Sequence, residues 1–278
     1  IGFLGGKLLD YFSLNHEVIS GDINPKNKSI IGIDATNKKE IEKFLFFEKP
    51  DIVIDTIALS SYFDCEKNPE LCKRLNYDSA KFIAQVCLKI DAKMVFISSS
   101  YIFNGEKGDY LESDKPNSVT KYAESKINAE QKVLELRSSI IIRSEPMYGF
   151  DNERKRIIFG TNTFEYYAIV GFPNLIRKPL YIDDLPPIIY SLIIKNQSGI
   201  FNVAGPTKLK WLDFLTELSS LENAEHKIKI VDNSRWLLKP PNDSSLDVSK
   251  ISALGIETTN FSLALKEIKE KIIKSKLN

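Results

Sequence analysis

Cysteine and histidine are both scarce in this sequence. Its 278 residues include 3 cysteines and 2 histidines. Cys65, Cys72 and Cys87 form no C-x-x-C pair, and two histidines are too few to complete a typical metal site with them. The sequence therefore predicts no metal, and it predicts a reducing compartment in which sparse cysteines are buried as small apolar side chains.

An excess of charge and a long apolar run are also missing. The formal net charge is +1, and charges of both signs are mixed along the chain. No basic field indicates a nucleic-acid partner. No apolar run reaches the roughly 18 residues of a membrane-spanning helix, and no leader of basic then apolar residues opens the chain. We expect a cytoplasmic protein with neither a membrane nor a nucleic-acid partner, and the charge balance suits a small-molecule enzyme.

Short β-branched runs alternate with longer amphipathic stretches in the first half of the chain. The expected strands are 17–21, 52–55, 94–98 and 140–143, and the expected helices are 7–13, 39–47, 69–88 and 121–136. Such short apolar runs suit strands that are covered on both faces, as in a parallel sheet. The alternation predicts right-handed βαβ units and hence an α/β fold, a Rossmann-type doubly wound parallel sheet.

This rhythm breaks after Gly149. We expect a dinucleotide-binding domain over 1–150 and a smaller, C-terminal substrate-binding lobe over 151–278, with about 180–205 returning to the main sheet. In that half the pattern predicts strands at 199–203 and 227–231 and helices at 211–221 and 261–274.

The first residues contain half of a glycine motif. Gly2-x-x-Gly5 matches the last two glycines of G-x-x-G-x-x-G, whose turn lies between a strand and a helix. Backbone N–H groups around Phe3 and Leu4 would then face a pyrophosphate at the helix N-terminus; the alternative is an ordinary tight turn. The strand before the turn is absent from this numbering, so we expect roughly ten further residues before Ile1.

An acidic residue follows the glycines at a suitable distance. Asp22 lies 17 residues after Gly5, at the end of the run His16-Glu-Val-Ile-Ser-Gly-Asp22. An acid there binds the adenosine ribose hydroxyls of NAD and repels the 2′-phosphate of NADP, so Asp22 favours NAD. The alternative is a turn-forming aspartate before Asn24-Pro25.

The pattern most indicative of chemistry is a run of serines, Ser98–Ser100, at a strand end, followed by Tyr122-x-x-x-Lys126. Residues four apart share a helix face, so the phenol and the ammonium can converge. A nearby cation favours the phenolate and would lower the Tyr122 pKa from its usual value near 10. Tyr122 would then act as general acid/base toward a carbonyl that Ser99 holds by a hydrogen bond.

These pieces together resemble an extended short-chain dehydrogenase/reductase, most closely the dTDP-4-dehydrorhamnose reductase branch. The matching pieces run in order from Ile1 to about Gly255, and they are Gly2-Phe-Leu-Gly5, Asp34-Ala-Thr36, Pro50-Asp-Ile-Val-Ile-Asp55, Asn76, Ile97-Ser-Ser-Ser-Tyr-Ile-Phe-Asn-Gly105, Tyr122-x-x-x-Lys126, Ile142-Arg143, Tyr148-Gly149, Leu180-Tyr-Ile-Asp-Asp184, Phe201-Asn-Val-Ala-Gly205 and Ser244-Ser-Leu-Asp247 with Lys250.

The resemblance implies an NAD- or NADP-dependent reductase of a nucleotide-linked sugar, and the family suggests a homodimer. It implies catalytic roles for Ser99, Tyr122 and Lys126. The residues that it implies for the cofactor are Gly2, Phe3, Leu4, Gly5, Asp22, Asp34, Ala35, Thr56, Ala58, Leu59, Asn76, Tyr122 and Lys126, with Asn76 supporting Lys126 through water. Those that it implies for the sugar are Ser60, Tyr62 and Tyr101, although packing alone also explains the two tyrosines.

Three departures from the branch leave the sugar open. The usual Ser-Thr-Asp-Tyr is Ser98-Ser-Ser-Tyr101 here, the usual Thr-Ser-Trp is replaced within Ser144-Glu-Pro-Met147, and Asp55 replaces the usual asparagine. Dehydration is disfavoured because the Asp-Glu pair that dehydratases use is absent. Two alternatives remain: a nucleotide-sugar 4-epimerase, and a non-catalytic binding subunit like the regulatory subunit of methionine adenosyltransferase.

Overall fold

The computed structural model describes residues 2–25, 28–160, 162–163, 168–170, 172–231 and 239–277. Ile1, where the expected glycine turn begins, lies outside them. The chain forms two compact units that interleave along the sequence. The first unit comprises 1–102, 119–143 and 185–201, and the second comprises 103–118, 144–184 and 202–278.

The first unit contains most of the predicted strand–helix alternation. Its elements are α1 (Phe3–Phe12), β1 (Ser20–Asp22), β2 (Ile30–Gly32), α2 (Lys38–Glu48), β3 (Ile52–Asp55), α3 (Tyr62–Lys67), α4 (Pro69–Lys73), the π-helix η1 (Arg74–Asp78), α5 (Ser79–Ile90), β4 (Lys93–Ser99), the 3₁₀ turn η2 (Ser100–Ile102), α6 (Lys121–Val133), β5 (Ile140–Ser144), α7 (Leu185–Ile194) and β12 (Gly199–Val203).

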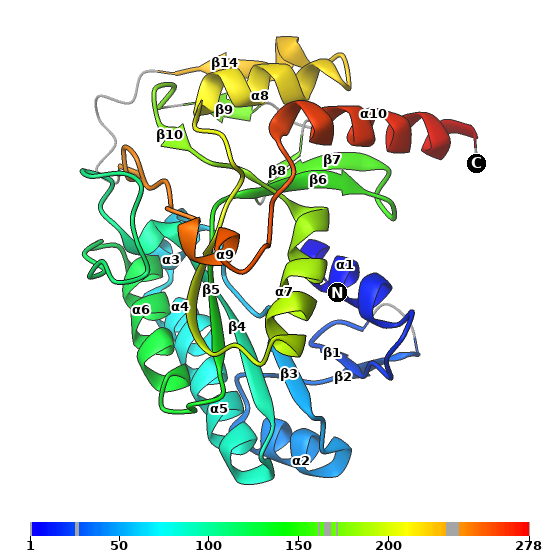
Figure 1. The fold of residues 1–278 in the computed structure, drawn as a ribbon, viewed down its shortest axis with the longest axis vertical. Helices are drawn as coiled ribbons and strands as arrows, with labels where there is room; N and C mark the ends of the chain where they lie inside the picture. The colour runs from blue at the N-terminus through cyan, green and yellow to red at the C-terminus, as the bar shows by residue number, and fades with distance from the viewer. Residues whose placement is uncertain are drawn as a thin grey trace. The chain divides into compact units, whose positions relative to one another are not determined.

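A sheet with the strand order β12-β5-β4-β3 forms the centre of this unit. β3 and β4 pair in parallel from Ile52 opposite Lys93 to Asp55 opposite Phe96. Figure 1 shows α5 and α6 on one side of these strands and α7 on the other. The predicted α/β fold with a parallel central sheet is confirmed. A separate parallel pair, β1 and β2, completes the strands of the unit.

The core of the first unit lies between the sheet and the helices α2, α5 and α6. Leu45, Val86, Met94, Val133 and Ile141 are among its buried side chains. Each of these helices lies between two successive strands in the chain (Figure 1). Because one face of each helix is buried in this core, apolar residues recur on that face at a period near 3.6. The three cysteines are buried free thiols, as predicted.

Two local predictions were wrong. The strand expected at 17–21 is β1 at Ser20–Asp22, which is shorter and lies further along the chain. The single helix expected over 69–88 is divided, because η1 separates α4 from α5. A π-helical turn accommodates an extra residue within a helix and is often found at functional sites. Here it contains the buried Asn76.

The second unit is built mainly from short strands, most of which the sequence pattern did not reveal, whereas the strand predicted at 227–231 and the helices predicted at 211–221 and 261–274 are present. Its elements are β6 (Met147–Asp151), β7 (Arg156–Phe159), β8 (Asn162–Thr163), β9 (Ala168–Val170), β10 (Ile176–Arg177), β11 (Leu180–Tyr181), the 3₁₀ turn η3 (Ile182–Asp184), β13 (Leu209–Lys210), α8 (Trp211–Ser220), the 3₁₀ turn η4 (Glu225–Lys227), β14 (Ile228–Ile230), α9 (Ser249–Ser252) and α10 (Phe261–Leu277).

Aromatic packing holds the second unit together. β11-β6-β7-β8 form its largest sheet, and Tyr148 of β6 contacts Phe214 of α8 and Phe261 of α10 with ring centroids 5.1 and 5.6 Å apart. β6 and β7 are antiparallel, so a hairpin stands where the sequence showed no clear alternation. Within the described part of the chain, no helix combines the length and apolar character needed to cross a bilayer.

Candidate active site

The three serines at the end of β4 have different environments. The Ser98 hydroxyl is buried and donates to Glu130 Oε1 at 2.5 Å, and Ser100 is fully buried. Ser99, the last residue of β4, is half-buried, and its Oγ accepts the Tyr101 N–H at 3.1 Å. Of the three, Ser99 is therefore the one with a partly accessible hydroxyl at the strand end.

Helix α6 presents Tyr122 and Lys126 one turn apart. Thr120 caps the helix, because its Oγ1 accepts the Ala123 N–H at 3.1 Å, and a capped helix start fixes the direction of the first turns. Tyr122 is 7% exposed and Lys126 is 2% exposed. The Tyr122 hydroxyl is hydrogen-bonded to Ser99. The structure thus brings Ser99 and Tyr122 together, and their catalytic roles stay predictions.

The Lys126 ammonium lies against the sheet. Its Nζ donates to the Ile97 carbonyl oxygen at 2.8 Å and sits 4.6 Å from the centre of the Phe96 ring. Burial lowers the pKa of Lys126 to about 8, while the negative charges of Asp55 and Glu130 oppose that shift. The contact of the ammonium with the Phe96 ring stabilises its positive charge, but less than full hydration would, so the pKa of Lys126 still falls.

The Tyr122 pKa shifts in the direction opposite to the one that we predicted. Burial raises it to about 12, and the hydrogen bond from Ser99 only partly opposes this shift. The predicted net lowering of the Tyr122 pKa is wrong for this structure because removal of the phenol from water disfavours the phenolate. At neutral pH Tyr122 is a neutral phenol and can donate a proton.

Asn76 organises the polar groups beneath this pair. Its Oδ1 accepts the Leu59 N–H at 2.7 Å, and its amide nitrogen donates to the Leu59 carbonyl at 3.1 Å and to Ser125 Oγ at 3.1 Å. The same amide contacts Cys72 Sγ at 3.4 Å. Asn76 therefore fixes the backbone of Leu59, a residue for which the family resemblance implies a cofactor contact. Its support of Lys126 through water stays a prediction.

The start of α1 has the geometry of a phosphate site. Gly2 is the extended N-cap, no side chain caps the helix, and the first helical residues are Phe3, Leu4 and Gly5. N–H groups in a first turn have no partner within the helix, and a Cβ on Gly2 would meet no atom within 4 Å. First-turn amides beside the open space at Gly2 fit the pyrophosphate of a dinucleotide.

The acidic residues expected at the adenosine end are both engaged in local turns. Asp22 is half-buried and its Oδ1 accepts the Asn24 N–H at 2.8 Å, which is the turn role that we considered as the alternative. Asp34 Oδ1 accepts both the N–H and the hydroxyl of Thr36 at 2.8 Å. Ala35 is 9% exposed and belongs to the core. The cofactor roles of both aspartates stay predictions.

The other residues expected near the cofactor and the sugar differ in exposure. Thr56 is half-buried, and Ala58 and Ser60 are exposed. Tyr62 and Tyr101 meet edge to face with ring centroids 6.0 Å apart. Both rings pack in the cluster that contains Tyr122 and Leu59. The structure therefore places the two tyrosines beside the proposed catalytic phenol.

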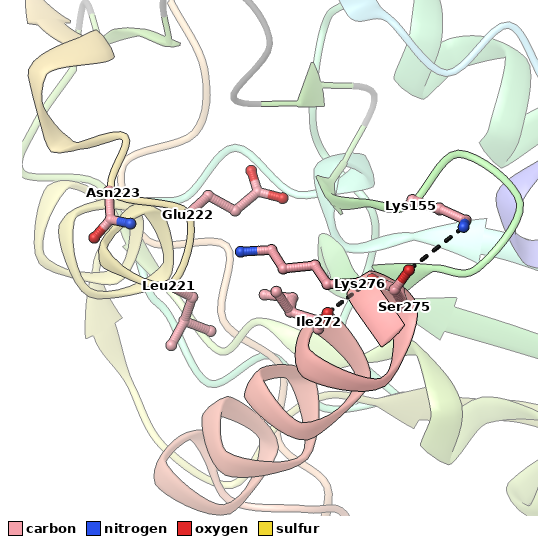
Figure 2. A pocket seen from close by; sticks show the side chains of 7 residues that line it. All are labelled: Lys155, Leu221, Glu222, Asn223, Ile272, Ser275 and Lys276. Carbon is pink, nitrogen blue, oxygen red and sulfur yellow. Dashed lines mark hydrogen bonds between the residues drawn. The ribbon is translucent and has the colours of Figure 1, made fainter. Parts of the chain in front are cut away.

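A hollow of about 280 Å³ lies elsewhere, in the second unit, and Figure 2 shows its lining. Lys155 donates there to the Ser275 carbonyl at 3.4 Å, and Glu222 accepts the Ile157 N–H at 2.8 Å. The hollow contains none of the residues predicted for the site. Both contacts are made to backbone groups that are distant in the sequence.

Sequence reasoning assigned no role to two buried acids. Asp55 is 3% exposed at the end of β3. Glu145 is 1% exposed in the second unit, where burial raises its pKa to about 8 against the opposing charge of Arg177. At both positions the sequence departs from the family pattern. That departure is the sequence feature that could have pointed to these two acids.

Comparison with known proteins identifies the family of this chain. The family model for the RmlD substrate binding domain matches residues 1–273. The chain belongs to this family. A dTDP-4-dehydrorhamnose reductase of Aggregatibacter actinomycetemcomitans is 26% identical over 256 residues, covering 85% of this chain and 86% of the relative. The predicted resemblance to this branch is confirmed.

Two further similar proteins have different names within this comparison, one a subunit of methionine adenosyltransferase and the other a reductase. The methionine adenosyltransferase 2 subunit beta of Bos taurus is 24% identical over 283 residues, covering 96% of this chain and 84% of the relative. A crystal structure of the dTDP-4-dehydrorhamnose reductase of Bacillus anthracis in complex with NADP superposes with a TM-score of 0.73 at 23% identity, covering 85% of this chain and 86% of that one. The second similarity supports the fold.

Proposed function

We propose that this protein is an NAD(P)-dependent reductase of a nucleotide-linked keto-sugar. The observation that carries the proposal is the hydrogen bond between Ser99 and Tyr122 at the carboxyl end of β4, with Lys126 one turn further along α6, in a chain of the RmlD family. Ligands in open α/β sheets bind at that edge. The sugar itself is left open, because Glu145 and Ser100 stand where the branch has other residues.

The residues of the first unit fit a dinucleotide. The first-turn amides of α1 would hold the pyrophosphate, and the Asp22 carboxylate would bind the ribose hydroxyls. Leu59, fixed by Asn76, would line the nicotinamide half. When bound, NAD(P)H supplies the hydride.

The side chains of the site bind the carbonyl oxygen, donate the proton and stabilise the resulting phenolate. Ser99 holds the carbonyl oxygen by a hydrogen bond, and Tyr122, a neutral phenol at neutral pH, donates its proton to that oxygen as the carbonyl carbon is reduced. The phenolate left behind is stabilised by the positive charge of Lys126. Because Lys126 titrates at about pH 8, this stabilisation is present below that pH and is lost above it.

The purified protein is expected to oxidise NAD(P)H only when a nucleotide-linked keto-sugar is present, one cofactor for each sugar reduced. We would assay dTDP-4-dehydrorhamnose first and then other nucleotide-linked 4-keto-sugars, following the loss of reduced-cofactor absorbance and the product by chromatography. The corresponding nucleotide sugars without a keto group serve as controls. Absence of keto-sugar-dependent oxidation across the panel contradicts the proposed activity.

Asp22 is expected to set the preference between the two cofactors. In a calorimetric titration NADH should bind more tightly than NADPH, and Asp22→Ser should tighten NADPH by roughly tenfold, about 1.4 kcal/mol, because a negative charge beside the 2′-phosphate is removed. Asp10→Ser, which removes an exposed carboxylate from α1, is the matched control and should leave both affinities unchanged. An unchanged NADPH affinity in Asp22→Ser would leave Asp22 with only its turn role.

A non-catalytic cofactor-binding subunit is the second candidate, and the similarity over 96% of this chain to the methionine adenosyltransferase subunit favours it. Such a protein would bind NAD(P)H in the titration yet oxidise none with any keto-sugar. A 4-epimerase would convert nucleotide sugars without net loss of reduced cofactor. The same two assays therefore separate the three functions.

A further inference from the structure

Asp55 is a buried carboxylate with an unused hydrogen-bonding oxygen. It ends β3 and is 3% exposed. Its Oδ1 accepts the Ile57 N–H at 2.9 Å, whereas its Oδ2 has no hydrogen-bond partner in the described part of the chain. Burial of an unpaired carboxylate oxygen is costly unless a nearby positive charge offsets it.

The sheet register places Asp55 beside Lys126. Asp55 is opposite Phe96 in the parallel pairing of β3 with β4, and residues opposite each other in a parallel ladder direct their side chains to the same face. The Lys126 ammonium lies over the Phe96 ring, 4.6 Å from its centre, and bonds the carbonyl of the next residue, Ile97. The carboxylate and the ammonium are therefore on one face of the sheet, and each acts on the charge of the other.

The other charged or titratable groups around Lys126 are already engaged. Glu130, on the same helix, is paired with Arg143, whose Nη2 is 2.8 Å from its Oε2. Cys65 on α3 and Cys72 on α4 also face Lys126. Their mutual hydrogen bond raises the pKa of Cys65 and lowers that of Cys72 to about 7.

Asp55 itself is faced by Lys126 and by Cys87 of α5. Burial raises the pKa of Cys87 to about 12, so that thiol stays neutral. The charge that Asp55 meets is the Lys126 ammonium.

We propose that Asp55 is the counter-charge of Lys126 and keeps this lysine protonated at mildly alkaline pH, so that the site stays active there. The inference rests on the proposed function, in which the ammonium of Lys126 stabilises the Tyr122 phenolate. Asp55 is a positioning residue that acts through Lys126. The family usually has a neutral asparagine at this position, so we expect this charge effect in this chain and not in relatives that have the asparagine.

The pKa shifts of Asp55 and Lys126 give the direction in which replacing Asp55 changes the Lys126 pKa. Burial raises the Asp55 pKa to about 6 and lowers that of Lys126 to about 8. Both groups are charged between these values, and each then favours the charged form of the other. Replacing Asp55 with a neutral residue removes the attraction, so Lys126 loses its proton at a lower pH.

Asp55→Asn is the variant that tests this, and it is expected to fold. The asparagine Oδ1 can still accept the Ile57 N–H. The raised Asp55 pKa also means that ionisation of this carboxyl weakens the fold as pH rises from about 4 to about 6. The variant lacks that penalty at neutral pH. Its circular dichroism and thermal unfolding verify the fold directly.

The primary measurement reads Lys126 itself and requires no activity. In protein labelled with ¹³C at lysine Cε, the Lys126 signal is assigned by its loss in Lys126→Arg and is then titrated by NMR. We expect its pKa to fall in Asp55→Asn by on the order of one unit, the size typical of removing a neighbouring opposite charge. Asp51→Asn is the matched control, because Asp51 is an exposed carboxylate just before the same strand, and it should leave the Lys126 titration unchanged.

The second measurement is the pH profile of turnover with a nucleotide-linked keto-sugar that the protein reduces. The alkaline limb should move to lower pH in Asp55→Asn by the same amount as the NMR titration. An unchanged Lys126 titration would overturn the inference, and so would a shifted titration with an unmoved alkaline limb. If no keto-sugar is reduced by the natural chain, the proposed function fails, while the NMR result still decides whether Asp55 is the counter-charge.

Discussion

Replacing Tyr122 with phenylalanine is expected to lower turnover by roughly 10²-fold or more while leaving cofactor affinity nearly unchanged. The phenol is buried and hydrogen-bonded to Ser99, and burial keeps it protonated at neutral pH, ready to donate to a carbonyl oxygen. Phenylalanine keeps the ring that packs in the cluster with Cys65 and Cys72 and removes only the proton donor. The loss should therefore be in the chemical step.

The measurement is single-turnover reduction, with NAD(P)H affinity determined separately by titration. Tyr190→Phe is the matched control, since Tyr190 is a half-buried tyrosine of α7 in the same unit and packs on Phe12 at 6.2 Å between ring centroids. Its turnover should match that of the natural chain. A Tyr122→Phe variant with full turnover would remove this phenol from the mechanism.

Removing Arg143 is expected to destabilise the protein by about 3–5 kcal/mol, the usual cost of breaking a buried ion pair from one side. Arg143 and Glu130 have side chains that are 3% and 4% exposed, and Nε and Nη2 of the arginine contact the two Glu130 oxygens at 3.0 and 2.8 Å. In Arg143→Met the Glu130 carboxylate would remain buried, with the Ser98 hydroxyl as its remaining hydrogen bond in this network. The free energy of unfolding is measured by chemical denaturation.

Two further variants separate the lost ion pair from lost packing. Lys132→Met breaks a surface pair between Lys132 of α6 and Glu135 just after that helix, with side chains 39% and 63% exposed, and little change in the free energy of unfolding is expected. The double variant Glu130→Leu with Arg143→Met leaves no buried charge and should recover much of the loss. Equal destabilisation in the single and double variants would show that packing, and not the unpaired carboxylate, is responsible.

The sequence predicted those features that depend on local patterns. The alternation of β-branched and amphipathic segments indicated the parallel sheet and its helices, and the four-residue spacing placed Tyr122 and Lys126 on one face of α6. Thr120, the helix cap, comes directly before that segment. Strand-end serines were recognisable for the same reason. These properties depend on neighbours within one helix or strand.

Features that depend on distant partners could not be predicted. The Tyr122 pKa moves up because the whole cluster around the phenol excludes water, and no spacing reports that burial. Glu130 meets Arg143 across the helix–sheet interface, and Asp55 comes level with Phe96 only through the register of β3 and β4. The π-helical turn at Asn76 follows from tertiary contacts to Leu59, which override a continuous helical pattern.

The most direct test of the proposed reductase is to follow the hydride. The protein would be incubated with a nucleotide-linked 4-keto-sugar and with NAD(P)H that carries deuterium on the transferable position of nicotinamide C4, and the released sugar nucleotide would be analysed by mass spectrometry. We predict one deuterium on the reduced carbon of the sugar and one equivalent of oxidised cofactor in solution. A product that contains no deuterium, or a reduced cofactor that remains fully intact, would contradict the assignment.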